Sequence, residues 1–300
     1  MARKILITGA EGQLGKALQF AFADQFTILP TTRNPSMDSI KKRNISQLDI
    51  TIKEDVSKCI ASFIPDIIVN CAAYSDVDAN ESNKDLAHEV NVDGLNNLIH
   101  SSDKNTYIIQ ISSDYVFNGA DGPYDEEDHT FPVNYYGKTK LEAENILRGT
   151  RRRWVIIRPN VLYSDNFFCR GNFFAWVYKS LSKGQTISVV TDQISNPTSI
   201  HQLVISIFQS IILMYEGILH IGSDDYLSRY EFATTVAEVI GFDHSLILPI
   251  DTKSLFEKIA SYTAERPINS GLKIDKIERE LNISTYSSKY SLKKIKAIMI

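Results

Sequence analysis

A serine, a tyrosine and a lysine have the types and spacing needed to protonate a carbonyl oxygen while a hydride reaches the carbon. Tyr136 and Lys140 lie four residues apart in a helical pattern, so their side chains are expected on one helix face. A free phenol has a pKa of about 10, and a nearby ammonium lowers it by favouring the phenolate. Ser113 follows an apolar segment typical of a buried strand, where its hydroxyl can polarise the carbonyl. We therefore assign Tyr136 as general acid, Lys140 as its partner and Ser113 as the carbonyl ligand.

A second phenol, Tyr135, lies five residues from Lys140 and is expected to face elsewhere. An isolated Y-x-x-x-K spacing is also found in ordinary amphipathic helices. A glycine-rich segment at the start of the chain favours the catalytic interpretation of this spacing.

Three glycines, Gly9, Gly12 and Gly15, stand between an apolar strand pattern and a helical pattern. This is the context in which a glycine loop binds a dinucleotide, because the loop turns tightly and brings backbone close to the pyrophosphate. The first turn of the helix then presents N–H groups to the phosphate anions. The whole loop is assigned to the cofactor, with Glu11, Gln13 and Leu14 beside the glycines. Tyr136 and Lys140 are assigned to the cofactor as well, because Lys140 can also hold the nicotinamide ribose.

The choice of cofactor depends on the end of the second strand. An NAD site usually has an acid there that binds the ribose hydroxyl, whereas this chain reads Pro-Thr-Thr-Arg at positions 30–33. Arg33 can meet a 2′-phosphate through its forked donors, although a solvated loop arginine is the alternative. We expect NADPH and leave NADH open. Asp49 and Ile50 are assigned to the adenine side of the site, with a helix-capping role for Asp49 as the alternative.

Strand and helix patterns alternate along the first half of the chain, which predicts an α/β fold of the Rossmann type: a doubly wound parallel sheet with a smaller mixed substrate lobe. Strands are expected at 4–8, 26–29, 66–71, 107–112 and 154–157, and helices at 14–22, 85–101 and 136–147. Further helices are expected at 173–181, 201–214 and 228–240, the last opened by a capping box of Ser228 and Glu231. We assign residues 1–159 and about 192–240 to the dinucleotide domain, and about 160–191 and 241–300 to the substrate lobe.

Composition gives no sign of a nucleic-acid or membrane protein. The net charge is −4, with 32 basic and 36 acidic residues in 300, and no apolar run reaches the roughly 18–20 residues of a membrane span. The cysteines at positions 59, 71 and 169 have no metal spacing, and the carboxylates form no convincing cluster, so no metal is expected. An immediate first strand leaves no room for a signal peptide, and a reducing cytoplasm is expected. The oligomeric state is left open, a homodimer included.

The motifs together resemble the extended short-chain dehydrogenase/reductase superfamily, and within it the dTDP-4-dehydrorhamnose reductase branch. The resemblance extends over nearly the whole chain. It is carried by residues 9–15, 70–74 with Val77 and Asp78, 111–117, 134–140, Asp192 and Gln193 with Pro197 and Thr198, and Arg266 and Pro267 with Ser270 and Leu272.

This resemblance implies an oxidoreductase of nucleotide-sugar and polysaccharide biosynthesis that reduces the 4-keto group of dTDP-4-dehydro-L-rhamnose. It implies the roles already given to Ser113, Tyr136 and Lys140. Ala72, Ala73 and Tyr74 would line the path of the cofactor beyond the pyrophosphate. On the substrate side we expect Asp114, Tyr115, Asn172 and Arg266, with a structural salt bridge as the alternative for Arg266. Asn91 is expected to support the site from a helix, with a simple hydrogen bond to a backbone carbonyl as the alternative.

Three departures from the branch keep other readings open. Residues 158–164 read Arg-Pro-Asn-Val-Leu-Tyr-Ser, without the aromatic that the branch often has there, and Ser195 replaces a glycine. A related nucleotide-sugar reductase or epimerase is therefore one alternative. Ala17 stands where some members have a magnesium-binding Glu, which agrees with the absence of a metal assignment. The regulatory β subunit of methionine adenosyltransferase resembles the same branch, so a cofactor-binding regulatory protein is the second alternative.

Overall fold

The computed structural model describes residues 2–36, 39–40, 44–165, 172–259 and 263–299. Cys169 lies outside these ranges. Contacts between Cα atoms divide the chain into two compact units. Unit 1 comprises residues 1–113, 135–157 and 207–218, and unit 2 comprises residues 114–134, 158–206 and 219–300. The division expected from the sequence puts 114–134, 158–159, 192–206 and 219–240 with the cofactor domain, whereas these residues cluster with unit 2. Which unit holds the substrate stays a prediction.

The centre of unit 1 is a seven-stranded sheet with the order β11-β6-β5-β4-β1-β2-β3. The strands at its middle are apolar and buried on both faces, as expected for a parallel sheet covered by helices. Parallel pairing joins β2 to β3, β1 to β2 and β4, and β5 to β4 and β6. The strands are β1 (Lys4–Thr8), β2 (Thr27–Thr32), β3 (Ser46–Gln47), β4 (Ile67–Asn70), β5 (Tyr107–Ile111), β6 (Trp154–Pro159) and β11 (Gly217–Ile221), the last two ending in unit 2.

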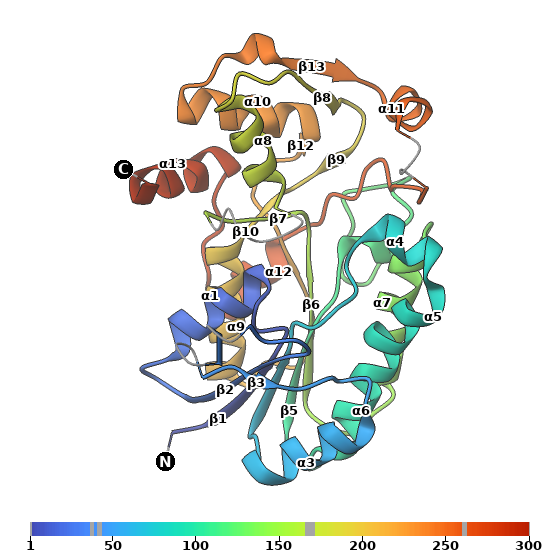
Figure 1. Cartoon of the computed structure of the whole chain (residues 1–300), viewed down its shortest axis with the longest axis vertical. Coiled ribbons are helices and arrows are strands. Elements are labelled where there is room, and N and C mark those ends of the chain that lie inside the picture. Colours follow the sequence, from blue (N-terminus) through green and yellow to red (C-terminus); the bar gives the residue numbers. More distant parts are fainter. Residues whose placement is uncertain (1, 37–38, 41–43, 166–171, 260–262, 300) are drawn as a thin grey trace. The chain divides into compact units, whose positions relative to one another are not determined.

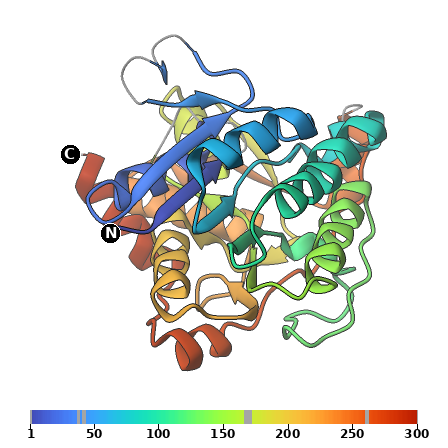
Figure 2. The ribbon, with the colours of Figure 1, turned by 90° about the horizontal axis from the view of Figure 1, so that it is seen from below.

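Helices cover both faces of this sheet (Figures 1 and 2). On one face, α3 and α6 pack on Leu6 and Ile68, and α6 and α7 pack on Ile108 and Ile156. On the other face, Phe22 of α1 lies 6.1 Å from the ring of Phe208 in α9. The helices are α1 (Gln13–Phe22), α3 (Lys53–Phe63), α4 (Val77–Ser82), α5 (Lys84–His88), α6 (Gly94–Ser101), α7 (Tyr135–Arg148) and α9 (Ile200–Leu213), which begins in unit 2.

Unit 2 has short strand pairs and helices around a core of its own. In that core, Phe174 of α8 and Phe232 of α10 pack with Leu292 and Ile295 of α13. Strand pairs are β8·β13, β7·β10 and β9·β12. The helices are α8 (Phe173–Leu181), α10 (Arg229–Ile240), α11 (Thr252–Lys258), α12 (Asp275–Leu281) and α13 (Ser288–Met299), and the strands are β7 (Leu162–Tyr163), β8 (Ile187–Val190), β9 (Ile194–Ser195), β10 (Thr198–Ser199), β12 (Leu227–Ser228) and β13 (Ile247–Ile250).

The Rossmann-type fold expected from the sequence is confirmed. The capping box at the start of α10 is also confirmed: Glu231 N–H donates to Ser228 Oγ at 3.1 Å, and Ser228 N–H donates to Glu231 Oε2 at 2.7 Å. The expected single helix at 85–101 is wrong in one respect, because a π-helical turn, η1 (Glu89–Asp93), separates α5 from α6. Within the described ranges, no helix combines the length and apolar character of a membrane span.

Candidate active site

The glycine loop connects β1 to α1 and is shaped by contacts that leave no space for side chains. Gly9 has φ +63°, and a Cβ there would lie 2.8 Å from backbone atoms of Cys71 and Ala72. A Cβ on Gly15 would lie 2.4 Å from the carbonyl oxygen of Gly9. Gly12 is the N-cap of α1, so a residue without a side chain stands where the helix opens. A tight turn and an exposed helix start are the features that admit a pyrophosphate, and the loop therefore fits a dinucleotide.

The side chains that the sequence assigns to the adenine end of the cofactor have partners within unit 1. Glu11 accepts a hydrogen bond from Ser39 Oγ. Asp49 Oδ1 accepts from Thr51 N at 3.0 Å and from Thr51 Oγ1 at 2.8 Å, which closes a turn ahead of α3. The helix-capping alternative is wrong, because the N-cap of α3 is Ile52 and no side-chain hydrogen bond caps it. The Ile50 side chain is buried in the core under α3 and α6, and its contact with a cofactor stays a prediction. Arg33 is exposed directly after β2, where it can meet a phosphate.

A buried asparagine fixes the loop after β4. Asn91, in the π-helical turn, accepts from Tyr74 N at 2.8 Å and donates to Tyr74 O at 3.2 Å. Its amide also donates to Thr139 Oγ1 at 2.9 Å, and Thr139 donates to the carbonyl of Tyr136 at 2.8 Å. Asn91 thus ties the loop at 72–74, assigned to the cofactor, to the helix that carries Tyr136.

Tyr136 and Lys140 lie one turn apart in α7, and Lys140 reaches the strand that precedes Ser113. The Lys140 Nζ donates to the carbonyl of Ile111, the last residue of β5, at 2.6 Å. Lys140 is 3% exposed, and Ser113 is 8% exposed. Burial lowers the pKa of Lys140 to about 8, and the negative charge of Glu144 opposes this change. The structure therefore brings the lysine to the carboxyl end of β5, as the Ser-Tyr-Lys assignment requires.

The competing phenol, Tyr135, has a different environment. Its backbone N–H donates to Glu81 at 2.7 Å, and Lys84 lies over its ring at 5.4 Å. Burial, followed by the negative charges of Glu142, Asp85 and Glu81, raises the pKa of Tyr135. A general acid for a ketone needs the opposite shift, so Tyr136 remains the assigned donor.

A ladder of buried polar side chains, which sequence reasoning missed, crosses the ends of three strands. Thr8 donates to Asn70 at 2.6 Å, and Asn70 donates to Gln110 at 2.8 Å. Gln110 donates at 3.1 Å to the same Ile111 carbonyl that Lys140 contacts. The available signal was a single polar residue near the end of each otherwise apolar strand.

The residues expected on the substrate side belong to unit 2. Asp114 is buried and Tyr115 half-buried in the turn η2 (Asp114–Val116). Asn172 is the N-cap of α8: it accepts from Ala175 N at 3.2 Å and donates to Ser164 O at 2.8 Å. Arg266 donates to Ala264 O at 2.6 Å. These contacts give Asn172 a structural role, and substrate contact by all four residues stays a prediction.

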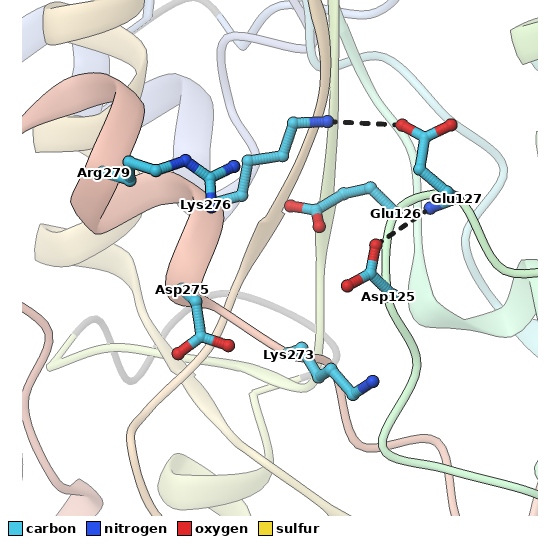
Figure 3. A pocket seen from close by; sticks show the side chains of 7 residues that line it. All are labelled: Asp125, Glu126, Glu127, Lys273, Asp275, Lys276 and Arg279. Carbon is cyan, nitrogen blue, oxygen red and sulfur yellow. Dashed lines mark hydrogen bonds and ion pairs between the residues drawn. The ribbon is translucent and has the colours of Figure 1, made fainter.

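Unit 2 also contains a charged cavity of about 280 Å³ (Figure 3). It is lined by Asp125, Glu126, Glu127, Lys273, Asp275, Lys276 and Arg279. Lys276 lies 3.5 Å from Glu127, so opposite charges of the lining already pair with one another. Among the described residues, no group of three or more His, Cys, Asp or Glu side chains is arranged to hold a metal ion.

The chain has relatives among known proteins that match it over nearly its whole length. A dTDP-4-dehydrorhamnose reductase of Aggregatibacter actinomycetemcomitans is 34% identical over 311 aligned positions, covering 99% of both chains. The crystal structure of a dTDP-4-dehydrorhamnose reductase from Bacillus anthracis in complex with NADP superposes with a TM-score of 0.85 at 30% identity, covering all of both chains. The mouse methionine adenosyltransferase 2 subunit beta is 29% identical over 92% of this chain and 82% of its own.

The family model described as "RmlD substrate binding domain" matches residues 3–299. The match includes the glycine loop, the strand end at Ser113 and the helix of Tyr136 and Lys140. The chain belongs to the RmlD substrate binding domain family, within the extended short-chain dehydrogenase/reductase superfamily.

Proposed function

We propose that this protein is an NADPH-dependent reductase of a nucleotide-linked keto sugar, with dTDP-4-dehydro-L-rhamnose as its substrate and dTDP-L-rhamnose as its product. The observation that carries the proposal is the placement of Lys140, one turn after Tyr136, against the end of the strand that leads into Ser113. The relatives that are named dTDP-4-dehydrorhamnose reductases support the choice of substrate.

Each assigned residue has a separate role in the proposed reaction. The glycine loop receives the pyrophosphate of NADPH, and Arg33 binds its 2′-phosphate. When bound, NADPH supplies the hydride to C4 of the sugar. Ser113 donates a hydrogen bond to the 4-keto oxygen, and Tyr136 gives that oxygen its proton. Lys140 stabilises the phenolate that remains, because its ammonium is buried in a medium of low dielectric constant and the residue lies one helical turn after the tyrosine.

The test is oxidation of NADPH, followed at 340 nm, with dTDP-4-dehydrorhamnose generated in the same cuvette. The Tyr136→Phe variant keeps the ring but lacks the proton. Turnover by the natural chain, with a loss of at least about 100-fold in the variant, is the expected result. Equal rates in the two proteins would remove Tyr136 from the mechanism.

A regulatory, cofactor-binding role is the second candidate, since the mouse methionine adenosyltransferase subunit is also a relative. The last helix, α13, buries Leu292 and Ile295 in the core of unit 2, so much of its apolar face is already used. Tight NADPH binding without turnover on dTDP-4-dehydrorhamnose, or on other nucleotide-linked keto sugars, would favour this second role.

A further inference from the structure

Glu144 is a buried carboxylate that the proposed reaction does not use. It lies in α7, one turn after Lys140, and its exposed fraction is 0%. Its Oε1 accepts a hydrogen bond from the hydroxyl of Ser112, the residue that precedes Ser113. A fully buried acid is costly unless it is paired and hydrogen-bonded, so its position in α7 calls for a reason.

The contact with Ser112 makes Glu144 one half of a two-point connection between α7 and the end of β5. Lys140 donates to the carbonyl of Ile111, and Ser112 donates to Glu144. Two successive residues at the strand end are thus held by two residues one helical turn apart. This connection sets the register between the helix that carries Tyr136 and the strand end that carries Ser113.

The charge of Glu144 has a second effect. Removing an ammonium from water disfavours its charged form, and burial lowers the pKa of Lys140 to about 8. Glu144, in the same helix, opposes this change, as does Cys71 at the end of β4. Burial raises the pKa of the Cys71 thiol to about 12, so Cys71 carries no charge near neutral pH. Glu144 is therefore the acid that can compensate the buried ammonium at physiological pH.

We propose that Glu144 is a positioning residue of the active site, whose carboxylate supports the buried Lys140 one turn away in α7 and holds this helix against the strand end at Ser112. This inference rests on the proposed function, because it gives Glu144 a role only through Lys140 and Tyr136. It predicts a change in the pH dependence of NADPH binding, which a purely structural residue would not produce.

The test compares Glu144→Gln with Glu142→Gln, a matched loss of a carboxylate from the exposed side of the same helix. The measured quantity is kcat/KM for NADPH between pH 6 and 9, which reports the ionisations of the free enzyme. Losing a close opposite charge lowers the pKa of a lysine by about one unit or more. The alkaline limb should therefore move from near pH 8 to near pH 7 in E144Q. That shift costs about threefold in activity at pH 7.5 and little at pH 6, while E142Q should follow the natural chain.

A binding measurement and a second variant distinguish failure of the proposed function from failure of the role inferred for Glu144. The Kd of NADPH, followed by fluorescence over the same pH range, needs no turnover. If the natural chain lacks turnover but its Kd profile shifts in E144Q, the proposed function fails and the role of Glu144 stands. Glu144→Asp keeps the negative charge but moves it away from Lys140 by about one methylene. We therefore expect the alkaline limb to shift in the same direction as in E144Q, but by less. Unshifted profiles in E144Q, or in E144D should E144Q not fold, would overturn the inference.

Discussion

Replacement of Gly15 by alanine should weaken NADPH binding, because the tightest contact of the glycine loop is with backbone atoms that a side chain cannot displace easily. A Cβ at Gly15 would lie 2.4 Å from the Gly9 carbonyl oxygen and 2.7 Å from the Ala10 Cα. Ordinary contact begins near 3.4 Å, so Gly15→Ala must separate α1 from the loop by roughly 1 Å. Such overpacking costs about 1–3 kcal/mol. If NADPH needs the original loop, that cost weakens its Kd by about 5-fold to 150-fold.

The assay is an NADPH titration by fluorescence, together with thermal unfolding of the same samples. Gly149→Ala is the control, because its Cβ would meet its nearest atoms, the carbonyls of Asn145 and Ile146, only at 3.4 Å. That variant should bind NADPH like the natural chain. A Gly15→Ala protein that folds and binds NADPH with unchanged Kd would refute the claim that the close approach shapes the cofactor site.

Four other outcomes follow from single side chains. Tyr135→Phe should keep NADPH-dependent turnover within about twofold, because its hydroxyl is not the assigned acid; a loss comparable to that of a triad variant would reverse the assignment. Asn91→Ala should lower kcat by about tenfold or more, since it releases Thr139 and the loop after β4, and an unchanged kcat would make this network structural only. Arg33→Ala should raise KM for NADPH by about tenfold while leaving KM for NADH unchanged, as steady-state kinetics with both cofactors would reveal. Burial and a neighbouring arginine hold the pKa of His220 well below its usual value; the unfolded chain then binds the extra proton, so stability should fall below about pH 6.5 by up to about 1.4 kcal/mol per pH unit. Urea unfolding of His220→Asn should show a shallower fall, and equal slopes would contradict the assignment.

Local patterns predicted the glycine loop, the Tyr136–Lys140 pair and five strands of the sheet (β1, β2, β4, β5 and β6), because each depends on residues close together in the chain. The two-residue strand β3 was not predicted. The break at 89–93 could not be read in the same way. Residues 85–101 have a helical apolar pattern, whereas the π-helical turn coincides with Asn91, whose hydrogen-bond partners lie 17 and 48 positions away. Such turns often occur at functional sites, but tertiary contacts select their position.

Asp49 is a residue for which the sequence left two roles open. The sequence allowed either an adenine ligand or a helix cap. The carboxylate instead accepts from both the N–H and the hydroxyl of Thr51 in a turn, while the N-cap of α3 is Ile52. A carboxylate has two oxygens with room for about four hydrogen bonds. The two contacts with Thr51 use one oxygen, so they are compatible with adenine recognition by the carboxylate, which stays a prediction.

The polar ladder explains why a lysine can be buried at the end of a sheet. The side chain of Thr8 at the end of β1 accepts from Ala72 N and donates to Asn70, and the hydrogen bonds continue through Gln110 to Ile111. Each polar group in this series has a partner, so burying it carries little desolvation penalty. The ladder ends on the Ile111 carbonyl, which also accepts from Lys140. The series therefore connects β1, the strand that precedes the glycine loop, to the position of the Lys140 ammonium. A lysine ammonium has three donors, so one can hold Ile111 while others serve the nicotinamide ribose and Tyr136 in the proposed reaction. Shortening the ladder at Asn70 would therefore disturb cofactor binding and proton transfer together, because both depend on the same row of strand ends.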